Sequence, residues 1–233
     1  MGPKGTWTPL HADVFGSYSW SANVCGRKKW LLFPPGTEEL LLDDTKKIPY
    51  SVNEKELQHL CIPHLNVVQE TGEIIFVPSG WYHQVHNLED TISINHNWFN
   101  GCNILHIWDC LHLAATDVEK EISDCRIYDD WQEQWQMLLK VHHGMNYASF
   151  LQVLESILSS RLTQLKTEDL TSINWHHVFD IVSVRNVCLK MRTVELPLEV
   201  KEQVHVLESK IKSFLTECSE QGNFEQQNVF NNL

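Results

Sequence analysis

The sequence lacks the features that mark a membrane or secreted protein. No uninterrupted apolar run approaches the roughly 18 residues that a membrane-spanning helix needs. Met1 is followed by Gly-Pro-Lys-Gly and not by an apolar signal sequence. The seven cysteines are scattered and form no CxxC pair, which gives no support to a zinc knuckle or a dithiol redox motif and favours free thiols in a reducing compartment. We therefore expect a cytoplasmic protein without a membrane partner.

Basic residues are also scarce. Lys and Arg total 18 against 30 Asp and Glu, which gives a net charge of −12. The only tight basic run, residues 27–29, lies inside an apolar stretch and is typical of a strand and not of a phosphate-binding patch. Direct nucleic-acid binding is therefore disfavoured, and a basic protein or peptide partner is favoured. No GxSxG or Cys-His signature indicates a nucleophilic enzyme.

Large apolar side chains are plentiful. Hydrophobic residues make up 42% and charged residues 21% of the 233 residues, and nine Trp and nine Phe are among them. This composition is close to that of globular proteins and supplies a substantial core. Hydrophobic periodicity then divides the chain into two halves, so we expect an α+β protein.

Residues 6–100 have the pattern of β structure. Short runs with apolar alternation are separated by Gly-, Pro- and Asp-containing turns, which is typical of an antiparallel sandwich or barrel. The runs are residues 19–24, 29–33, 66–69, 73–77, 81–87 and 91–99. The polar segment 37–63 reads as an insert with a short helix at 54–60, and such loops often shape the mouth of a substrate site.

After Asn100 the apolar period becomes that of helices. The predicted helices are residues 104–122, 129–141, 147–165, 175–190 and 199–217. The third has an apolar stripe that is usually packed against other helices and less often forms a homodimer surface. We therefore expect a β region at 1–100, a helical region at 101–218 and a disordered tail at 219–233.

Three separated residues form a candidate metal site. In His11-Ala12-Asp13 the two metal-binding side chains are two positions apart, and on a strand such residues point to the same face. His83 opens another predicted strand after a Pro-Ser-Gly turn. Two imidazoles and one carboxylate on one face leave three octahedral positions open, which is the facial triad of non-haem Fe(II) oxygenases. An isolated HxD is common by chance, so the surrounding motifs decide its meaning.

Further stretches accompany the triad in a fixed order. Lys28 follows a Cys-Gly turn and leads into Lys-Trp-Leu-Leu-Phe-Pro-Pro; residues 72–83 read GEIIFVPSGWYH and residues 91–98 read TISINHNW. Over about residues 5–100, this set resembles the jumonji C domains of the hydroxylase subgroup. Within that family the chain is most similar to members described as lysyl hydroxylases of a translation termination (release) factor.

The resemblance implies a double-stranded β-helix of the jelly-roll or cupin type. It implies Fe(II) held by the triad, with 2-oxoglutarate and O2 as cosubstrates. Lys28 would pair with the distal carboxylate of 2-oxoglutarate, and Thr8 would donate a hydrogen bond to it; a buried carboxylate needs such a charge partner. Asn97 would line the same pocket, and Ser21 stands where close relatives carry Asn. The substrate would be a protein.

The remaining histidines have simpler explanations. His86 and His96 have the opposite strand parity to His83 and to Asn97, respectively, so we expect both to face away from the iron. The pairs 142–143 and 176–177 lie in predicted helices, where adjacent residues do not share a face.

The resemblance also implies further elements before His11, so the β-helix is expected to be incomplete and unevenly paired. Trp20, Trp30 and Phe76 are then candidates for abnormal exposure. This leaves open a non-catalytic interaction module as an alternative to a hydroxylase, and protein lysine demethylation as an alternative reaction.

Overall fold

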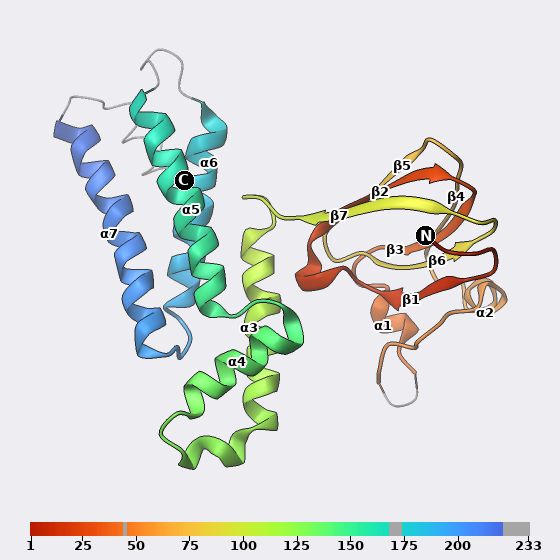
Figure 1. Ribbon diagram of the computed structural model, residues 1–233, viewed down its shortest axis with the longest axis horizontal. Coiled ribbons are helices and arrows are strands. Elements are labelled where there is room, and N and C mark those ends of the chain that lie inside the picture. The colour runs from red at the N-terminus through yellow and green to blue at the C-terminus, as the bar shows by residue number, and fades with distance from the viewer. Residues whose placement is uncertain (44–45, 168–173, 221–233) are drawn as a thin grey trace. The chain divides into compact units, whose positions relative to one another are not determined.

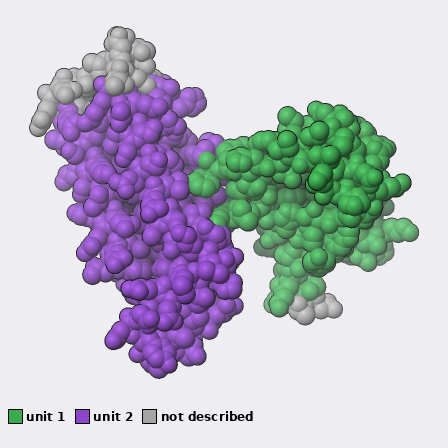
Figure 2. All heavy atoms as spheres, in the orientation of Figure 1, with its two compact units in different colours: residues 1–99 green, residues 100–233 purple. Residues whose placement is uncertain are grey.

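The structure, a computed structural model, describes residues 1–43, 46–167 and 174–220. The chain divides into two units, Met1–Phe99 and Asn100–Leu233, which are coloured separately in Figure 2. The first unit is built from strands and the second from helices, as the change of apolar period predicts (Figure 1). The tail predicted at 219–233 lies, from residue 221 onward, outside the described residues.

Two antiparallel sheets form the first unit (Figure 1). The four-stranded sheet has the order β1 (Trp7–His11), β6 (Tyr82–Asn87), β3 (Lys28–Phe33), β4 (Leu65–Gln69). The three-stranded sheet has the order β5 (Ile74–Val77), β2 (Tyr18–Cys25), β7 (Ile92–Trp98). This arrangement confirms the predicted jelly-roll sandwich, with an unequal number of strands in its two sheets.

The faces that the two sheets turn toward each other differ in chemistry. The four-stranded sheet contributes Trp30, Leu32 and Val85, which form one buried cluster with Val77 of β5. The middle strand of the other sheet instead buries polar residues at alternate positions: Ser19, Ser21 and Asn23. Such a polar interior must be hydrogen-bonded internally or by a ligand, because an unpaired buried polar group is costly.

The insert covers the outer face of the four-stranded sheet. It contains α1 (Glu38–Leu41) and α2 (Glu54–His59). Its buried residues join those that point outward from β1 and β3 in a second core cluster: Leu10, Leu31, Phe33, Leu41, Leu57 and Ile62. The described part of the insert therefore packs on the face opposite to the predicted metal ligands. A role for it at the mouth of the site has no support here.

The outer face of the three-stranded sheet is apolar and largely exposed. Phe76 is 54% exposed, as the expected uneven sandwich predicts, whereas Trp20 is partly buried and does not show the expected exposure. The same expectation is wrong for Trp30, which is only 5% exposed because it points between the sheets and donates a hydrogen bond to Gln69 (2.9 Å). On the outer face three aromatic rings lie with centroids within 5.8 Å of one another: Tyr18, Phe76 and Trp98.

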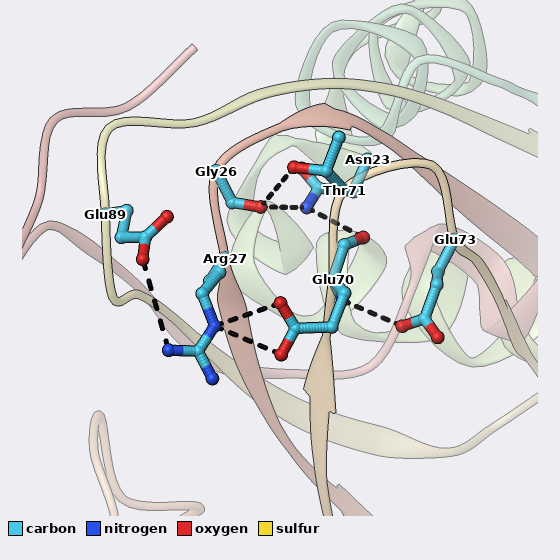
Figure 3. Close-up of polar contacts among 7 residues, drawn as sticks. All are labelled: Asn23, Gly26, Arg27, Glu70, Thr71, Glu73 and Glu89. Carbon is cyan, nitrogen blue, oxygen red and sulfur yellow. Dashed lines mark hydrogen bonds and ion pairs between the residues drawn. The ribbon is translucent and has the colours of Figure 1, made fainter.

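Three tight connections between the sheets, the β2–β3, β4–β5 and β6–β7 turns, lie at one end of the sandwich, where Figure 3 shows their polar contacts. The carbonyl of Gly26, in the β2–β3 turn, accepts hydrogen bonds from Asn23 Nδ2 (2.7 Å) and Thr71 Oγ1 (3.1 Å). Gly26 has a φ of +81°, and a Cβ built on it would lie 2.2 Å from the carbonyl oxygen of Asp90. Only glycine fits this crossing of chains.

Arg27 joins the same three turns by charge. Its guanidinium lies 3.0 Å from a carboxylate oxygen of Glu70, in the β4–β5 turn, and 4.0 Å from one of Glu89, in the β6–β7 turn (Figure 3). These groups are about half-exposed, so the free energy gained is small. These contacts hold together the end of the sandwich at which β3 begins with Lys28.

The described residues of the second unit form five main helices and a short 3-10 turn. The helices are α3 (Ile104–Glu121), α4 (Trp131–His143), α5 (Tyr147–Thr167), α6 (Trp175–Met191) and α7 (Leu198–Glu220). The apolar stripe of α5 belongs to the core of this unit. Its residues are each at most 2% exposed: Tyr147, Phe150, Leu151, Leu154 and Leu158. That stripe therefore does not offer a dimer surface. Within the described residues, no helix is both long and apolar enough to cross a membrane.

Candidate metal centre

A bulge in β1 creates the first half of the centre. Thr8 is paired with Val85 and His11 with His83, so β1 advances by three residues where β6 advances by two. In a regular strand, residues three apart would point to opposite faces. The extra residue lets both Thr8, which stays exposed, and His11 share the face of the sheet that carries His83, and there the His11 and His83 rings lie with centroids 4.2 Å apart.

The two imidazoles are oriented in the same way. His11 Nδ1 lies 2.8 Å from the carbonyl of Pro9, and His83 Nδ1 lies 3.2 Å from that of Trp81. A carbonyl only accepts, so each Nδ1 carries the proton and donates it, and each Nε2 keeps a free lone pair. This is the arrangement by which proteins usually orient metal-binding histidines.

Asp13 completes the cluster from just beyond the strand. The sequence predicts His11 and Asp13 on one strand, but β1 ends at His11; Asp13 keeps extended backbone (φ −62°, ψ 153°) before a 3-10 turn. Its Oδ2 accepts a hydrogen bond from Ser19 Oγ at 2.5 Å. One candidate ligand atom each from His11, Asp13 and His83 lies within 4.8 Å of the others.

The electrostatics of the cluster suit a cation. Burial lowers the pKa of His83, and the neighbouring His11 lowers it further, against a smaller opposing effect of Asp13. His83 is therefore held neutral, which is the form that binds a metal. Two imidazole nitrogens and one carboxylate oxygen fit the donor set of a 2-His-1-carboxylate iron site.

Lys28 supplies a positive charge between the two sheets. Its Nζ donates a hydrogen bond to Ser93 Oγ (3.0 Å) and lies 5.7 Å from the centre of the Trp30 ring. Burial lowers the pKa of Lys28, and within the described residues no carboxylate forms an ion pair with it. A half-buried ammonium without a counter-charge is suited to an anionic ligand.

The polar wall opposite Lys28 contains a hydroxyl without a partner. Ser21 is 2% exposed, and its Oγ has no hydrogen-bond partner in the described part of the chain. Register pairing places Asn95 and Asn97 on the same inner face as Ser21, and Asn97 Nδ2 donates to Ser17 Oγ (3.1 Å). These groups fit an oxygen-rich ligand such as 2-oxoglutarate, because it offers hydrogen-bond partners to such donors.

The predicted orientation of the other β-region histidines is confirmed. His86 points outward, stacks on Trp7 (centroids 5.9 Å apart) and has its Nε2 2.7 Å from Gln84 Nε2. His96 pairs with Trp20 on the exposed outer face of the other sheet. Sequence reasoning missed Ser19, which holds Asp13; its parity with Ser21 in β2 is the signal that could have identified it.

Comparison with known proteins is consistent with this geometry. Residues 1–98 match the family model described as "JmjC domain, hydroxylase". The matched stretch contains the two-sheet sandwich, the His-Asp-His cluster and the inner-face lysine.

Relatives extend the similarity into the helical unit. The chain is 46% identical over 211 residues, 80% of its length, to the 2-oxoglutarate and iron-dependent oxygenase JMJD4 of Danio rerio, of which it covers 50%. It is 44% identical over 199 residues to JMJD4 of Homo sapiens, covering 80% of this chain and 48% of that protein. Against the arginine-specific demethylase JMJ20 of Arabidopsis thaliana, identity is 52% over 158 residues, 64% of this chain and 34% of that protein. The chain thus spans about half the length of the JMJD4 proteins that it matches.

Proposed function

We propose that this JmjC protein is an Fe(II)- and 2-oxoglutarate-dependent protein hydroxylase, and that it hydroxylates a lysine of a translation release factor in the cytoplasm. One observation carries the oxygenase chemistry: the ligand atoms of His11, Asp13 and His83 lie within 4.8 Å of one another on the inner side of the sandwich. The similarity to JMJD4 oxygenases supports the same reaction class.

The residues of the chain have separate tasks in this proposal. The triad would hold the metal ion with three ligand atoms and would leave its other positions for cosubstrates. The Lys28 ammonium provides the counter-charge for the distal carboxylate of 2-oxoglutarate, and Thr8, Ser21 and Asn97 line the polar wall. When bound, iron and 2-oxoglutarate supply the oxidising chemistry, in which one oxygen atom of O2 enters a C–H bond and the other enters succinate.

The protein also shields the centre from water. His83 is 4% exposed, and the Trp30 ring lies against it with centroids 5.7 Å apart. An apolar wall beside a metal lowers the local dielectric and limits unproductive reactions with solvent. His11 is less buried than His83, so the centre opens on the side of β1.

Demethylation is the second candidate reaction. Protein lysine demethylation is the alternative expected from the sequence, and one relative is named an arginine-specific demethylase. Both reactions begin by oxidising a C–H bond, so the metal centre alone does not separate them. Hydroxylation is favoured over demethylation because the family model that matches residues 1–98 is described as a hydroxylase.

The test is incubation of the purified chain with Fe(II), 2-oxoglutarate, ascorbate and candidate release factors, followed by mass spectrometry. A gain of one oxygen on a lysine supports the proposal. Release of formaldehyde from methylated peptides, without oxygen gain on lysine, supports demethylation instead. Absence of succinate formation in the chain, under conditions where a full-length relative forms it, supports the non-catalytic interaction module.

A further inference from the structure

A groove in the helical unit has no part in the reaction described above. It lies along α6 and α7 and the connection between them, and its volume is about 680 Å³. Its floor is apolar and consists of side chains that are at most 5% exposed: Met191, Leu196, Val204 and Ile211. A hollow of this size with an apolar floor is in the usual range of binding sites.

The rim of the groove is positively charged, although the chain as a whole has a net charge of −12. Four basic side chains line it, Arg185, Arg192, Lys201 and Lys212, against a single carboxylate, that of Glu208. Because acidic residues outnumber basic ones in the chain, this local excess marks the groove as a surface for an anionic partner.

Two of these cations lack a counter-charge. Arg192 lies 3.5 Å from Glu208, and Lys201 pairs with the exposed Glu195. Arg185 and Lys212, in contrast, form no ion pair with any residue that the structure describes. Arg185 is also partly buried as a residue, which fixes its side chain along the groove more than that of the exposed Lys212.

The cations are spread along the groove. Arg185 and Arg192 are seven positions apart on or next to α6, which is about 10 Å along a helix axis. Lys201 and Lys212 are eleven positions apart on α7, or about 16 Å. A small organic anion has one charged headgroup and can therefore pair with the cations at only one end of the groove. A helix with carboxylates two to three turns apart meets several cations at once, because its i, i+7 and i+11 side chains share a face.

We propose that this groove binds an acidic amphipathic helix of a partner protein. Apolar residues of that helix lie on the floor formed by Met191, Val204 and Ile211, and its carboxylates pair with Arg185 and Lys212. This is the helix-in-groove mode of recognition with charges that set specificity. The proposal does not depend on the oxygenase activity, since none of the metal-centre residues belongs to the second unit.

The probe is a fluorescent helical peptide with Glu at positions i, i+7 and i+11 and Leu at i+3, i+4 and i+8. Its partner peptide carries Lys in place of each Glu. Binding of both peptides to the full chain is measured by fluorescence anisotropy at low and high salt. We expect the Glu peptide to bind, the Lys peptide not to bind, and the affinity to fall as salt screens the charges.

The double variant Arg185→Glu/Lys212→Glu tests the cations directly. We expect it to weaken binding of the Glu peptide by at least about tenfold, since charge reversal converts attraction into repulsion at two places. The control Lys120→Glu reverses an exposed lysine of α3 that pairs with Asp117 and lies outside the groove, and it keeps the affinity of the unmodified chain. Circular dichroism and thermal unfolding verify that each variant is folded.

Three results overturn the proposal. The first is the absence of Glu-peptide binding up to millimolar concentration, and the second is equal affinity in the double variant and the unmodified chain. The third is binding of decanoate that the Glu peptide does not displace, which assigns the groove to small organic anions.

Discussion

His11 and His83 face each other across the β1–β6 ladder, with their ring centroids 4.2 Å apart, because β1 carries one more residue than β6 between Thr8 and His11. Without that bulge, either Thr8 or His11 would point out of the sandwich. The irregular register therefore places a metal ligand and a pocket residue on the same face. His86 lies on the same strand as His83 but points to the opposite side of the sheet, so a substitution at His86 is a matched control for one at His83.

The first prediction concerns the ligands. His83→Ala removes one of three ligand atoms, so we expect Mn(II) affinity to fall by more than the roughly 10–100-fold that loss of an outer-shell partner costs. His86→Ala alters an outward-facing side chain and leaves Mn(II) affinity near that of the unmodified chain. Titration calorimetry measures both, and Mn(II)-soaked crystals locate the metal. Coordination by His86 or His96 instead of His83 contradicts the assignment.

The second prediction concerns cosubstrate binding. Lys28→Met keeps the length and apolar stem of the side chain but removes its charge, and we expect 2-oxoglutarate affinity to fall by about 3–5 kcal/mol, since a buried carboxylate loses its partner. Lys29→Met is the control, because Lys29 faces the opposite side of β3 and pairs with Glu54. Equal affinity in Lys28→Met and the unmodified chain removes Lys28 from the site.

The third prediction concerns stability and pH in the absence of cosubstrate. Burial lowers the pKa of Lys28 below its ordinary value of 10.5. Between the lowered value and 10.5 the unfolded chain binds more protons, so the free energy of unfolding rises with pH in that window. Lys28→Met removes the cost of burying the charge and stabilises the protein at neutral pH, by less than about 1 kcal/mol because water screens this half-exposed group. The difference in unfolding free energy between Lys28→Met and the unmodified chain, measured by urea unfolding, should disappear near pH 10.5. A difference that does not change with pH contradicts the burial of a charged Lys28 as its cause.

The sequence predicted the strands and the long helices because apolar alternation changes period at Asn100, and the structure places that change between its two units. Strand parity depends only on position, and the register confirms that Ser93, Asn95 and Asn97 share a face. The three candidate metal ligands were identified through their motifs, and the structure brings them together.

Other features depend on tertiary contacts that parity does not encode. The bulge at Pro9 and Leu10 is a matter of pairing register, so the sequence alone did not show how Thr8 and His11 come to share a face. Trp30 was expected to be exposed because the β-helix was expected to be incomplete, and strand alternation does not say which face is covered. Its indole N–H in fact donates to Gln69 between the sheets. The packing of the insert on the outer face was missed for the same reason.

The fourth prediction concerns the turn where the sheets are connected. Gly26→Ala places a Cβ 2.2 Å from a backbone oxygen and also forces a left-handed conformation, whereas Gly72→Ala has the same positive φ but nothing within 4 Å. We expect Gly72→Ala to cost about 1–2 kcal/mol of unfolding free energy, the ordinary penalty for a left-handed alanine. Gly26→Ala should cost clearly more, because Asp90 and its turn must move. Urea unfolding of the two variants provides the comparison, and equal costs contradict the close approach.

The last prediction concerns the exposed face of the three-stranded sheet. Ile74 and Ile94 both lie beside Ala22 on that face and are 68% and 59% exposed. Exposed apolar patches bind other apolar surfaces, and Thr keeps the β-branched shape that strands favour. Ile74→Thr/Ile94→Thr should therefore reduce binding of a hydrophobic dye and slow aggregation, with a change in unfolding free energy within about 0.5 kcal/mol per site. Val85→Thr, at a position 6% exposed between the sheets, is the control and should destabilise the domain by burying a hydroxyl. Marked destabilisation by the Ile74 and Ile94 changes would show that this face is covered in solution and would contradict its exposure in the isolated chain.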